Sequence, residues 1–142
     1  MRLRSSIKIL LILVATTSAS VAQGEVVVIV SSKSAITRIT PEQAARIFLG
    51  KDDKFPNEET ANPIDQPEGE AIRDEFYSKV AHKNSSQMAS YWSKLIFTGE
   101  GRLSKLVKGD KEVVKLIAND PKAIGYIDKR ALKKNVRVVL TP

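Results

Sequence analysis

The chain has 142 residues, the length of one ordinary domain, and a formal net charge of +7. It contains no cysteine and one histidine, His82, which excludes disulfides and thiolate metal sites and leaves too few histidines for a zinc site. A mild positive excess is weak support for nucleic-acid binding, so we expect no nucleic-acid partner and no cofactor.

The N-terminal segment has the layout of a secretory signal peptide. The first eight residues carry three basic side chains and no acidic one, and the next seven are all apolar. Ser20 and Ala22 then place small residues where signal peptidase needs them. The alternative is a membrane anchor, but the apolar run is far shorter than the roughly 20 residues that span a bilayer. We therefore interpret residues 1–22 as a signal peptide. Its removal would lower the charge from +7 to +4, because it takes away three of the 23 basic residues, and would leave residues 23–142 in the periplasm or secreted.

The first predicted elements are a strand and a helix. Residues 25–30 are mostly β-branched, which predicts a strand buried on both faces. Ser31 and Ser32 follow at its carboxyl end, where open α/β sheets bind ligands, although a serine-rich turn is also an ordinary loop. A helix is then predicted from a capping residue, Thr40, to Gly50, which we expect in a left-handed conformation.

The stretch around which the chain is organised comes next. Residues 63–65 are predicted to form a short strand that runs into a helix over 68–81, with Pro67 and Gly69 in the turn between them. A strand that ends at a helix N-terminus brings free backbone N–H groups and a positive dipole end to one place. If the protein binds a small ligand, we expect it at this turn. The alternative is an ordinary strand-to-helix corner without a ligand.

The rest of the chain continues to alternate between helices and strands. Asn84 is predicted to cap the clearest amphipathic helix, which carries Trp92 on its apolar face. We expect this face to pack against the sheet, and the alternative is that its aromatic side chains stack on a ligand. Asp110 is predicted to cap a further helix.

Two more strands are predicted near the end of the chain, over residues 123–127 and 136–140. Gly125, inside the first of them, indicates close approach of another chain segment. Together the elements predict an α/β fold with a small, mixed or largely parallel sheet that is covered by helices.

Three stretches, in this order, resemble the substrate-binding proteins of phosphate ABC transporters: residues 47–51, 65–76 and 123–127. The resemblance extends over about residues 25–140. It implies one lobe of a type II periplasmic-binding-protein-like fold and a non-catalytic role. The implied partners are a small solute, such as phosphate or another oxyanion, and a membrane transporter. Family members of full size hold the ligand between two lobes, whereas we expect a single domain over residues 23–142.

The ligand turn departs from the family pattern Arg-x-Asp-Gly-Ser-Gly-Thr. Gly69 matches, but the Arg, Asp, Ser, second Gly and Thr are replaced by Gln66, Glu68, Glu70, Ala71 and Ile72. The bidentate cation and the two hydroxyl donors for phosphate are missing, and the Glu70 carboxylate would repel an anion. We expect a degenerate phosphate site whose ligand-binding residues are Ser31, Ser32, Gln66, Glu68, Gly69 and Glu70.

A second class of function is a protein-interaction module. In that case the face that would meet the missing lobe binds another chain or a second copy, as in a homodimer. An exposed apolar patch on that face would favour this alternative, and a polar, concave surface would favour solute binding. An enzyme is not expected, because no nucleophile, base and orienting group stand out together in the sequence.

Overall fold

The structure is a computed structural model that describes residues 24–100 and 104–142. The predicted signal peptide over residues 1–22 and its cleavage before Gln23 lie outside these residues and stay predictions. Within the described ranges, none of the helices combines the length and the apolar character needed to cross a membrane.

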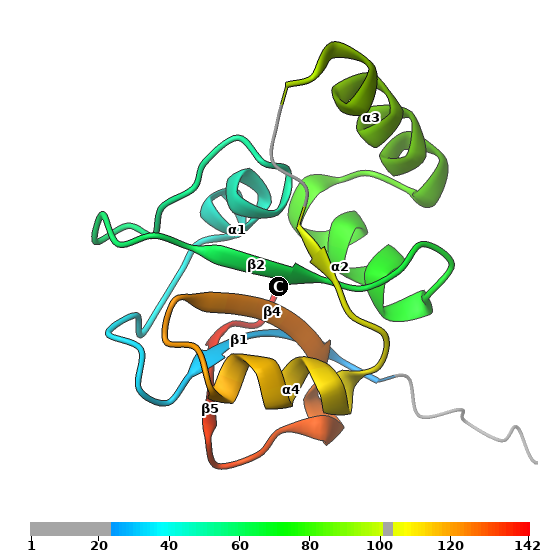
Figure 1. Cartoon of the computed structure of the whole chain (residues 1–142). Coiled ribbons are helices and arrows are strands. Elements are labelled where there is room, and N and C mark those ends of the chain that lie inside the picture. Colours follow the sequence, from blue (N-terminus) through cyan, green and yellow to red (C-terminus); the bar gives the residue numbers. More distant parts are fainter. Residues whose placement is uncertain (1–23, 101–103) are drawn as a thin grey trace, which may run out of the picture.

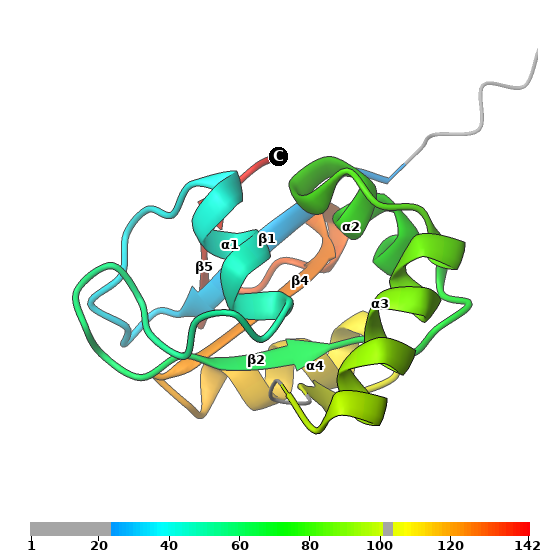
Figure 2. The same cartoon turned by 90° about the horizontal axis from the view of Figure 1, so that it is seen from above.

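The described chain folds into one mixed sheet with helices on both faces (Figures 1 and 2). The α/β class predicted from the sequence is confirmed. In chain order the elements are β1 (Val26–Ser31), α1 (Pro41–Phe48), β2 (Asn62–Asp65), α2 (Ala71–Ala81), α3 (Ser85–Thr98), β3 (Lys105–Leu106), α4 (Asp110–Ala118), β4 (Ala123–Asp128), a 3-10 turn (Lys129–Ala131) and β5 (Val136–Leu140).

The sheet has the strand order β3-β2-β4-β1-β5. β1 runs antiparallel to both of its neighbours, β4 and β5, whereas β2 runs parallel to β4 and to the two-residue edge strand β3. On β4, Gly125 lies opposite Ile64 on one side and Ile29 on the other. Because β2 runs parallel to β4 and β1 runs antiparallel to it, the carboxyl ends of β1 and β2 point in opposite directions along the sheet. Candidate residues that follow these two strands are therefore far apart.

Two apolar layers form, one on each face of the sheet. β1 is buried along its whole length, as predicted. Its alternate residues face a cluster shared with α1 and α2 on one side and a cluster shared with α4 on the other. At Gly125 a Cβ atom would lie 2.5 Å from Cδ1 of Ile117 and 3.1 Å from Cγ1 of Val113, both on α4. The close approach predicted for this glycine is confirmed, and it lets α4 lie tightly on the sheet.

Local signals placed three helix ends correctly, two on α1 and one on α3, and failed at the start of α4. Thr40 and Asn84 each form a capping box at the start of α1 and α3, and Gly50 has the expected positive φ of 72°. The prediction that Asp110 caps α4 is wrong, because Gly109 is the cap and Asp110 is the first helical residue. The Asp110 carboxylate is instead used by neighbouring strands, as described below.

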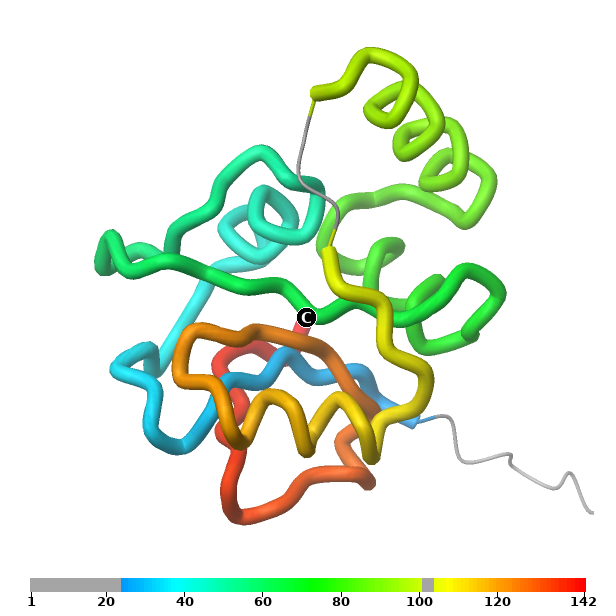
Figure 3. Tube along the Cα trace, in the orientation of Figure 1, coloured from blue at the N-terminus to red at the C-terminus, as the bar shows by residue number. Residues whose placement is uncertain are grey.

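The helix α3 projects from the rest of the molecule, as the chain trace in Figure 3 shows. Its first half is anchored, since Met88 is buried and the Tyr91 hydroxyl donates to the Leu49 carbonyl at 2.6 Å. Its second half leaves Ile96 65% exposed and Phe97 93% exposed. The expectation that the whole apolar face packs against the sheet is therefore wrong for this half.

Trp92, in the middle of α3, is partly buried rather than part of the core. Its ring lies against that of Tyr91, with centroids 5.3 Å apart, and it borders the apolar cluster shared with α1 and α2. The sequence placed Trp92 in the core because helical spacing identifies an apolar face but not what covers it.

Candidate functional site

A buried carboxylate at the end of β2 organises the turn into α2. Asp65 is 1% exposed and accepts hydrogen bonds from the hydroxyls of Tyr77 on α2 and Tyr126 on β4. The backbone N–H of Gln66 donates to it at 2.8 Å, and Nη1 of Arg73 lies 3.6 Å from it. A buried carboxylate is costly unless it is paired and hydrogen-bonded, so these groups belong together as one network.

The two tyrosine hydroxyls of this network remain donors over the physiological pH range. Burial, and secondarily the negative charge of Asp65, raises the pKa of Tyr77 well above the ordinary phenol value. The same two causes raise the pKa of Tyr126. The rings also stack within the core, since Tyr126 and Phe76 lie parallel with centroids 4.0 Å apart. The network is thus a fixed structural feature that ties α2 to the sheet.

The Gln66 side chain is buried and hydrogen-bonded within the protein, so it is not exposed to a ligand. It is 1% exposed, and its side-chain nitrogen donates to the Tyr126 carbonyl and to Oδ1 of Asp110, both at 3.0 Å. The other oxygen of Asp110 accepts from the backbone N–H of Asp128 at 3.1 Å. These bonds join β2, β4 and α4, which explains why Asp110 is not available as a cap.

A cation that the sequence analysis missed lies at this turn. Arg73, in the first turn of α2, is 8% exposed, and its Nη1 donates to the Gln66 carbonyl at 2.7 Å. Its guanidinium also lies over the Tyr77 ring, 5.4 Å from the centroid. The family pattern extends only to Ile72, one residue before Arg73. The spacing of Arg73 from Phe76 and Tyr77 at i, i+3 and i+4 could have placed it on the inner face.

The other candidates in this turn lie nearer the surface. Glu68 and Gly69 are exposed and Glu70 is partly exposed. Gly69 has a φ of 92° with no atom within 4 Å of the position of a Cβ, so the backbone conformation alone favours glycine there. Glu70 is the N-cap of α2, but its side chain makes no capping hydrogen bond.

A hollow of about 300 Å³ opens between this turn, α3 and β3. Its lining includes both charged and apolar residues. In two of the lining residues a side-chain polar atom, Nε1 of Trp92 and Oγ of Ser104, is buried without a hydrogen-bond partner in residues 24–100 and 104–142. The lining residues are Asp65, Glu68, Arg73, Trp92, Ile96, Ser104 and Leu106. Trp92 thus borders a cavity, and stacking of its ring on a ligand stays a prediction.

The structure does not bring Ser31 and Ser32 to this turn. Ser31 is fully buried at the far end of β1, where its Oγ donates to the Ala118 carbonyl at 3.3 Å and accepts from the Lys33 N–H at 3.1 Å. Ser32 is exposed, and its carbonyl accepts from Arg137 at 3.0 Å. The rule that placed the serines near the turn holds for parallel strands, whereas β1 is antiparallel to β4, the strand that β2 accompanies.

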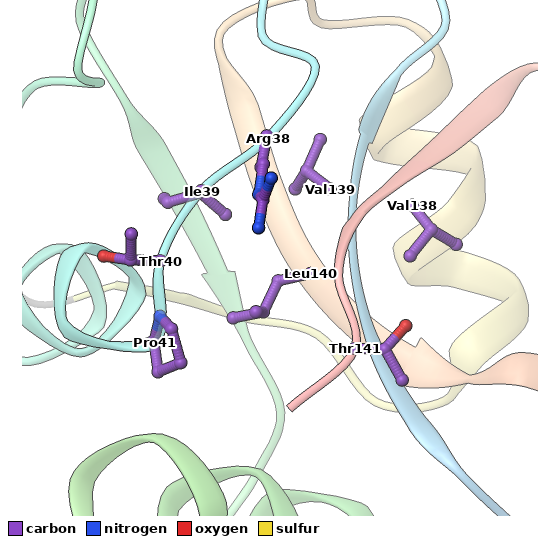
Figure 4. Close-up of a pocket in the computed structure, with 8 residues that line it drawn as sticks. All are labelled: Arg38, Ile39, Thr40, Pro41, Val138, Val139, Leu140 and Thr141. Carbon is purple, nitrogen blue, oxygen red and sulfur yellow. The ribbon is translucent and has the colours of Figure 1, made fainter.

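A second hollow, of about 380 Å³, lies between the segment before α1 and the strand β5 (Figure 4). Its lining is largely apolar, with Ile39, Pro41, Val139 and Leu140 among its residues, and Arg38 supplies the one charge. Because Arg38 is itself exposed, this hollow lacks the convergent buried polar groups of the first. No group of three potential metal ligands lies together within the described ranges. We therefore place the candidate site at the β2–α2 turn.

The strand order, the helices on both faces and the turn at the end of β2 define an α/β domain with a periplasmic-binding-protein-like fold. No family model and no curated protein matches the chain. Solved structures do match it. The putative phosphate ABC transporter substrate-binding protein of Clostridium perfringens, solved with bound phosphate, is 19% identical with a TM-score of 0.66, and the match covers 82% of this chain and 44% of that one.

Two further solved structures give the same result. The ABC-type phosphate transport receptor of Vibrio cholerae is 14% identical with a TM-score of 0.64 and 45% of its chain covered. PstS of Borrelia burgdorferi is 21% identical with a TM-score of 0.58 and 46% covered. Both matches cover 82% of this chain. The resemblance expected from the sequence is confirmed at the level of the fold, and the chain spans less than half the length of these proteins, as a single lobe would.

Proposed function

We propose that residues 23–142 form an exported, non-catalytic solute-binding or accessory protein whose binding site lies at the β2–α2 turn. The observation that carries the proposal is the hollow beside the buried Asp65–Arg73 pair, in a fold shared with proteins described as phosphate-binding. Charged groups that converge on a partly apolar cavity are typical of small-molecule sites.

The chemistry of this site disfavours inorganic phosphate as a tight ligand. Arg73 is the buried cation, and its charge is already shared with Asp65 at 3.6 Å. Glu68 borders the hollow and Glu70 stands at the start of α2, so a phosphate dianion would meet more negative than positive charge. We therefore propose that the turn is a degenerate phosphate site and that phosphate or another oxyanion binds weakly.

A thermal-shift series on the mature protein tests this function. Phosphate, sulfate, organophosphates, small carboxylates and small cations are added separately over a range of concentrations. A solute that binds only the folded state raises the free energy of unfolding by RT ln(1 + [L]/Kd), about 2.7 kcal/mol at 100 times Kd. The solute therefore raises the melting temperature as its concentration increases. We expect at least one small solute to do so. The proposal fails if no solute produces a concentration-dependent rise.

Export is tested separately from binding. We propose that cleavage after Ala22 releases the mature chain to the periplasm, where a membrane transporter would be its partner. Mass spectrometry of protein recovered from the periplasmic fraction should show an N-terminus at Gln23. Recovery of an intact Met1 in the membrane fraction would contradict the export proposal and leave the solute-binding proposal unaffected.

A protein-interaction role is the second candidate, and a specific observation favours it. Ile96, Phe97 and, on the edge strand β3, Leu106 are the large apolar side chains most exposed in the described chain, with Leu106 59% exposed. Apolar side chains that gather on one surface are typical of protein contacts. Analytical ultracentrifugation of the chain and of Phe97→Ser tests this role. A dimer that the substitution converts into a monomer would support it, and a parent chain that is monomeric at high concentration would exclude self-association.

A further inference from the structure

The hollow between the β2–α2 turn, α3 and β3 has a lining of two chemical kinds. Asp65, Glu68 and Arg73 are its charged residues, and Trp92, Ile96 and Leu106 are its apolar ones. The two kinds are neighbours, since Leu106 on β3 lies directly opposite Asp65 on β2. A ligand that fills this space therefore has both a polar group and an apolar group.

Arg73 is the one cation among the described residues that line the hollow. Arg73 carries five N–H donors, and within the described chain only its Nη1 has an acceptor in the protein, the Gln66 carbonyl. The remaining donors of its planar fork suit a carboxylate. Because Asp65 lies 3.6 Å from the same guanidinium and Glu68 lines the hollow, a dianion is disfavoured relative to a monoanion.

Two further polar atoms have no hydrogen-bond partner in residues 24–100 and 104–142. Nε1 of Trp92, which can only donate, and Oγ of Ser104 are buried with no acceptor or donor in the part of the chain that the structure describes. Both residues line the hollow. Buried polar atoms are normally hydrogen-bonded, so a ligand oxygen would supply the acceptor that the indole N–H lacks.

The apolar residues of the lining account for the body of the ligand. Ile96 is 65% exposed although it lines the hollow, and an apolar group placed against it and against Leu106 would remove this surface from water. The volume of about 300 Å³ is at the lower limit of small-molecule pockets. Inorganic phosphate would leave these apolar residues uncovered.

We propose that the hollow binds a small organic carboxylate, a monoanion whose carboxylate lies at Arg73 and whose apolar chain or ring lies against Trp92, Ile96 and Leu106. This inference rests on the proposed solute-binding function and names the class of its ligand.

Trp92 provides a direct probe, because the chain contains one tryptophan. Its fluorescence is measured during titration of the mature protein with hexanoate and with phenylacetate. Acetate carries the charge without the apolar body, hexan-1-ol carries the body without the charge, and inorganic phosphate is an anion without the body. We expect a saturable change with hexanoate or phenylacetate, and binding at least about tenfold weaker for the other three.

Three substitutions at exposed residues locate the effect. Glu68→Gln removes a negative charge from the lining and should strengthen hexanoate binding about two- to fivefold, the range of an exposed charge interaction. Leu106→Glu adds a negative charge to the lining and should weaken hexanoate binding by at least as much. Glu59→Gln changes the net charge by the same amount as Glu68→Gln, but it lies in an exposed loop outside the hollow and should leave binding unchanged.

The outcomes separate this inference from the function on which it rests. Saturable hexanoate or phenylacetate binding that responds to Glu68→Gln and Leu106→Glu, but not to Glu59→Gln, supports the inference. If both carboxylates are inert while phosphate or another solute raises the melting temperature, the inference is overturned and the solute-binding proposal stands. If no solute acts in either assay, both are overturned. Equal binding of hexanoate and hexan-1-ol would also overturn the inference, because it would remove the role of Arg73.

Discussion

Tyr126→Phe is the substitution that most sharply tests the network beneath the turn. The variant keeps the ring and its stack on Phe76, whose centroid is 4.0 Å away, and removes one hydroxyl. That hydroxyl donates to Asp65 and accepts from the Gln66 N–H at 3.1 Å. Asp65 is 1% exposed, so water cannot easily replace the lost donor.

The expected cost follows from the charge and the burial of the acceptor. A hydrogen bond to a charged group contributes about 1.5–3 kcal/mol, and we expect Tyr126→Phe to lose about 2–3 kcal/mol of unfolding free energy. Tyr91→Phe is the matched control, because its hydroxyl donates to a neutral carbonyl, that of Leu49, at a partly buried position. It should cost about 1 kcal/mol.

Urea denaturation of the parent and both variants measures the difference. For a domain of this size, each kcal/mol corresponds to roughly 3–6 °C of melting temperature, so thermal unfolding gives an independent estimate. The reasoning is refuted if Tyr126→Phe costs no more than Tyr91→Phe. That result would mean that Asp65 does not depend on the tyrosine.

Further predictions concern pH, packing, capping and phosphate. Burial, followed by the charge of Asp65, raises the pKa of Tyr77 and Tyr126 in the folded state. The unfolded chain therefore releases these protons first, and the free energy of unfolding should fall as the pH rises above about 10. Urea denaturation from pH 8 to 11 would contradict this if the unfolding free energy fell equally with pH in the parent and in Tyr126→Phe. Gly125→Ala should cost about 1–3 kcal/mol through overpacking against Ile117, and an unchanged urea midpoint would show that α4 yields freely. Glu70→Ser should raise stability by about 0.5–1 kcal/mol, because a serine can supply the side-chain cap that α2 lacks, and calorimetry that shows no gain would refute that reasoning. Isothermal titration of the mature chain with phosphate should give a Kd weaker than micromolar, and a tighter value would show that the phosphate-binding groups lie elsewhere.

Local sequence signals predicted the elements well because their causes are local. The capping residues Thr40 and Asn84 satisfy backbone donors within three residues of themselves, and Gly50 adopts a conformation set by its own missing side chain. The all-buried strand β1 was predicted from its own composition. The strand β3 was not predicted, since two residues carry no periodicity.

The candidate site was less predictable because it depends on direction and on tertiary partners. The sequence does not state that β1 runs antiparallel to β4, and this direction separates Ser31 from the turn. It also does not reveal that the side-chain nitrogen of Gln66 already donates hydrogen bonds to the Tyr126 carbonyl and to Asp110. Placing an arginine at Gln66 to restore the family pattern would therefore disrupt the interior rather than create a phosphate contact.

Arg73 is a candidate that the sequence did not indicate, because its position in the sequence looks ordinary. A basic residue in the first turn of a helix is unfavourable for the helix dipole and suggests a solvated side chain. Here the Gln66 carbonyl, Asp65 and the Tyr77 ring surround it. Only the three-dimensional structure places these three groups at one point, since they come from the end of β2 and from the following turn of α2.

The location of the binding site is the central claim, and an NMR titration tests it most directly. Mature protein labelled with ¹⁵N is titrated with hexanoate while the backbone amides and the Trp92 indole N–H are followed. The account predicts saturable shifts that centre on residues 66–73 and on the indole N–H, with the amides of residues 31–34 unchanged. Shifts confined to residues 31–34, or to the hollow between Arg38 and Leu140, would contradict it.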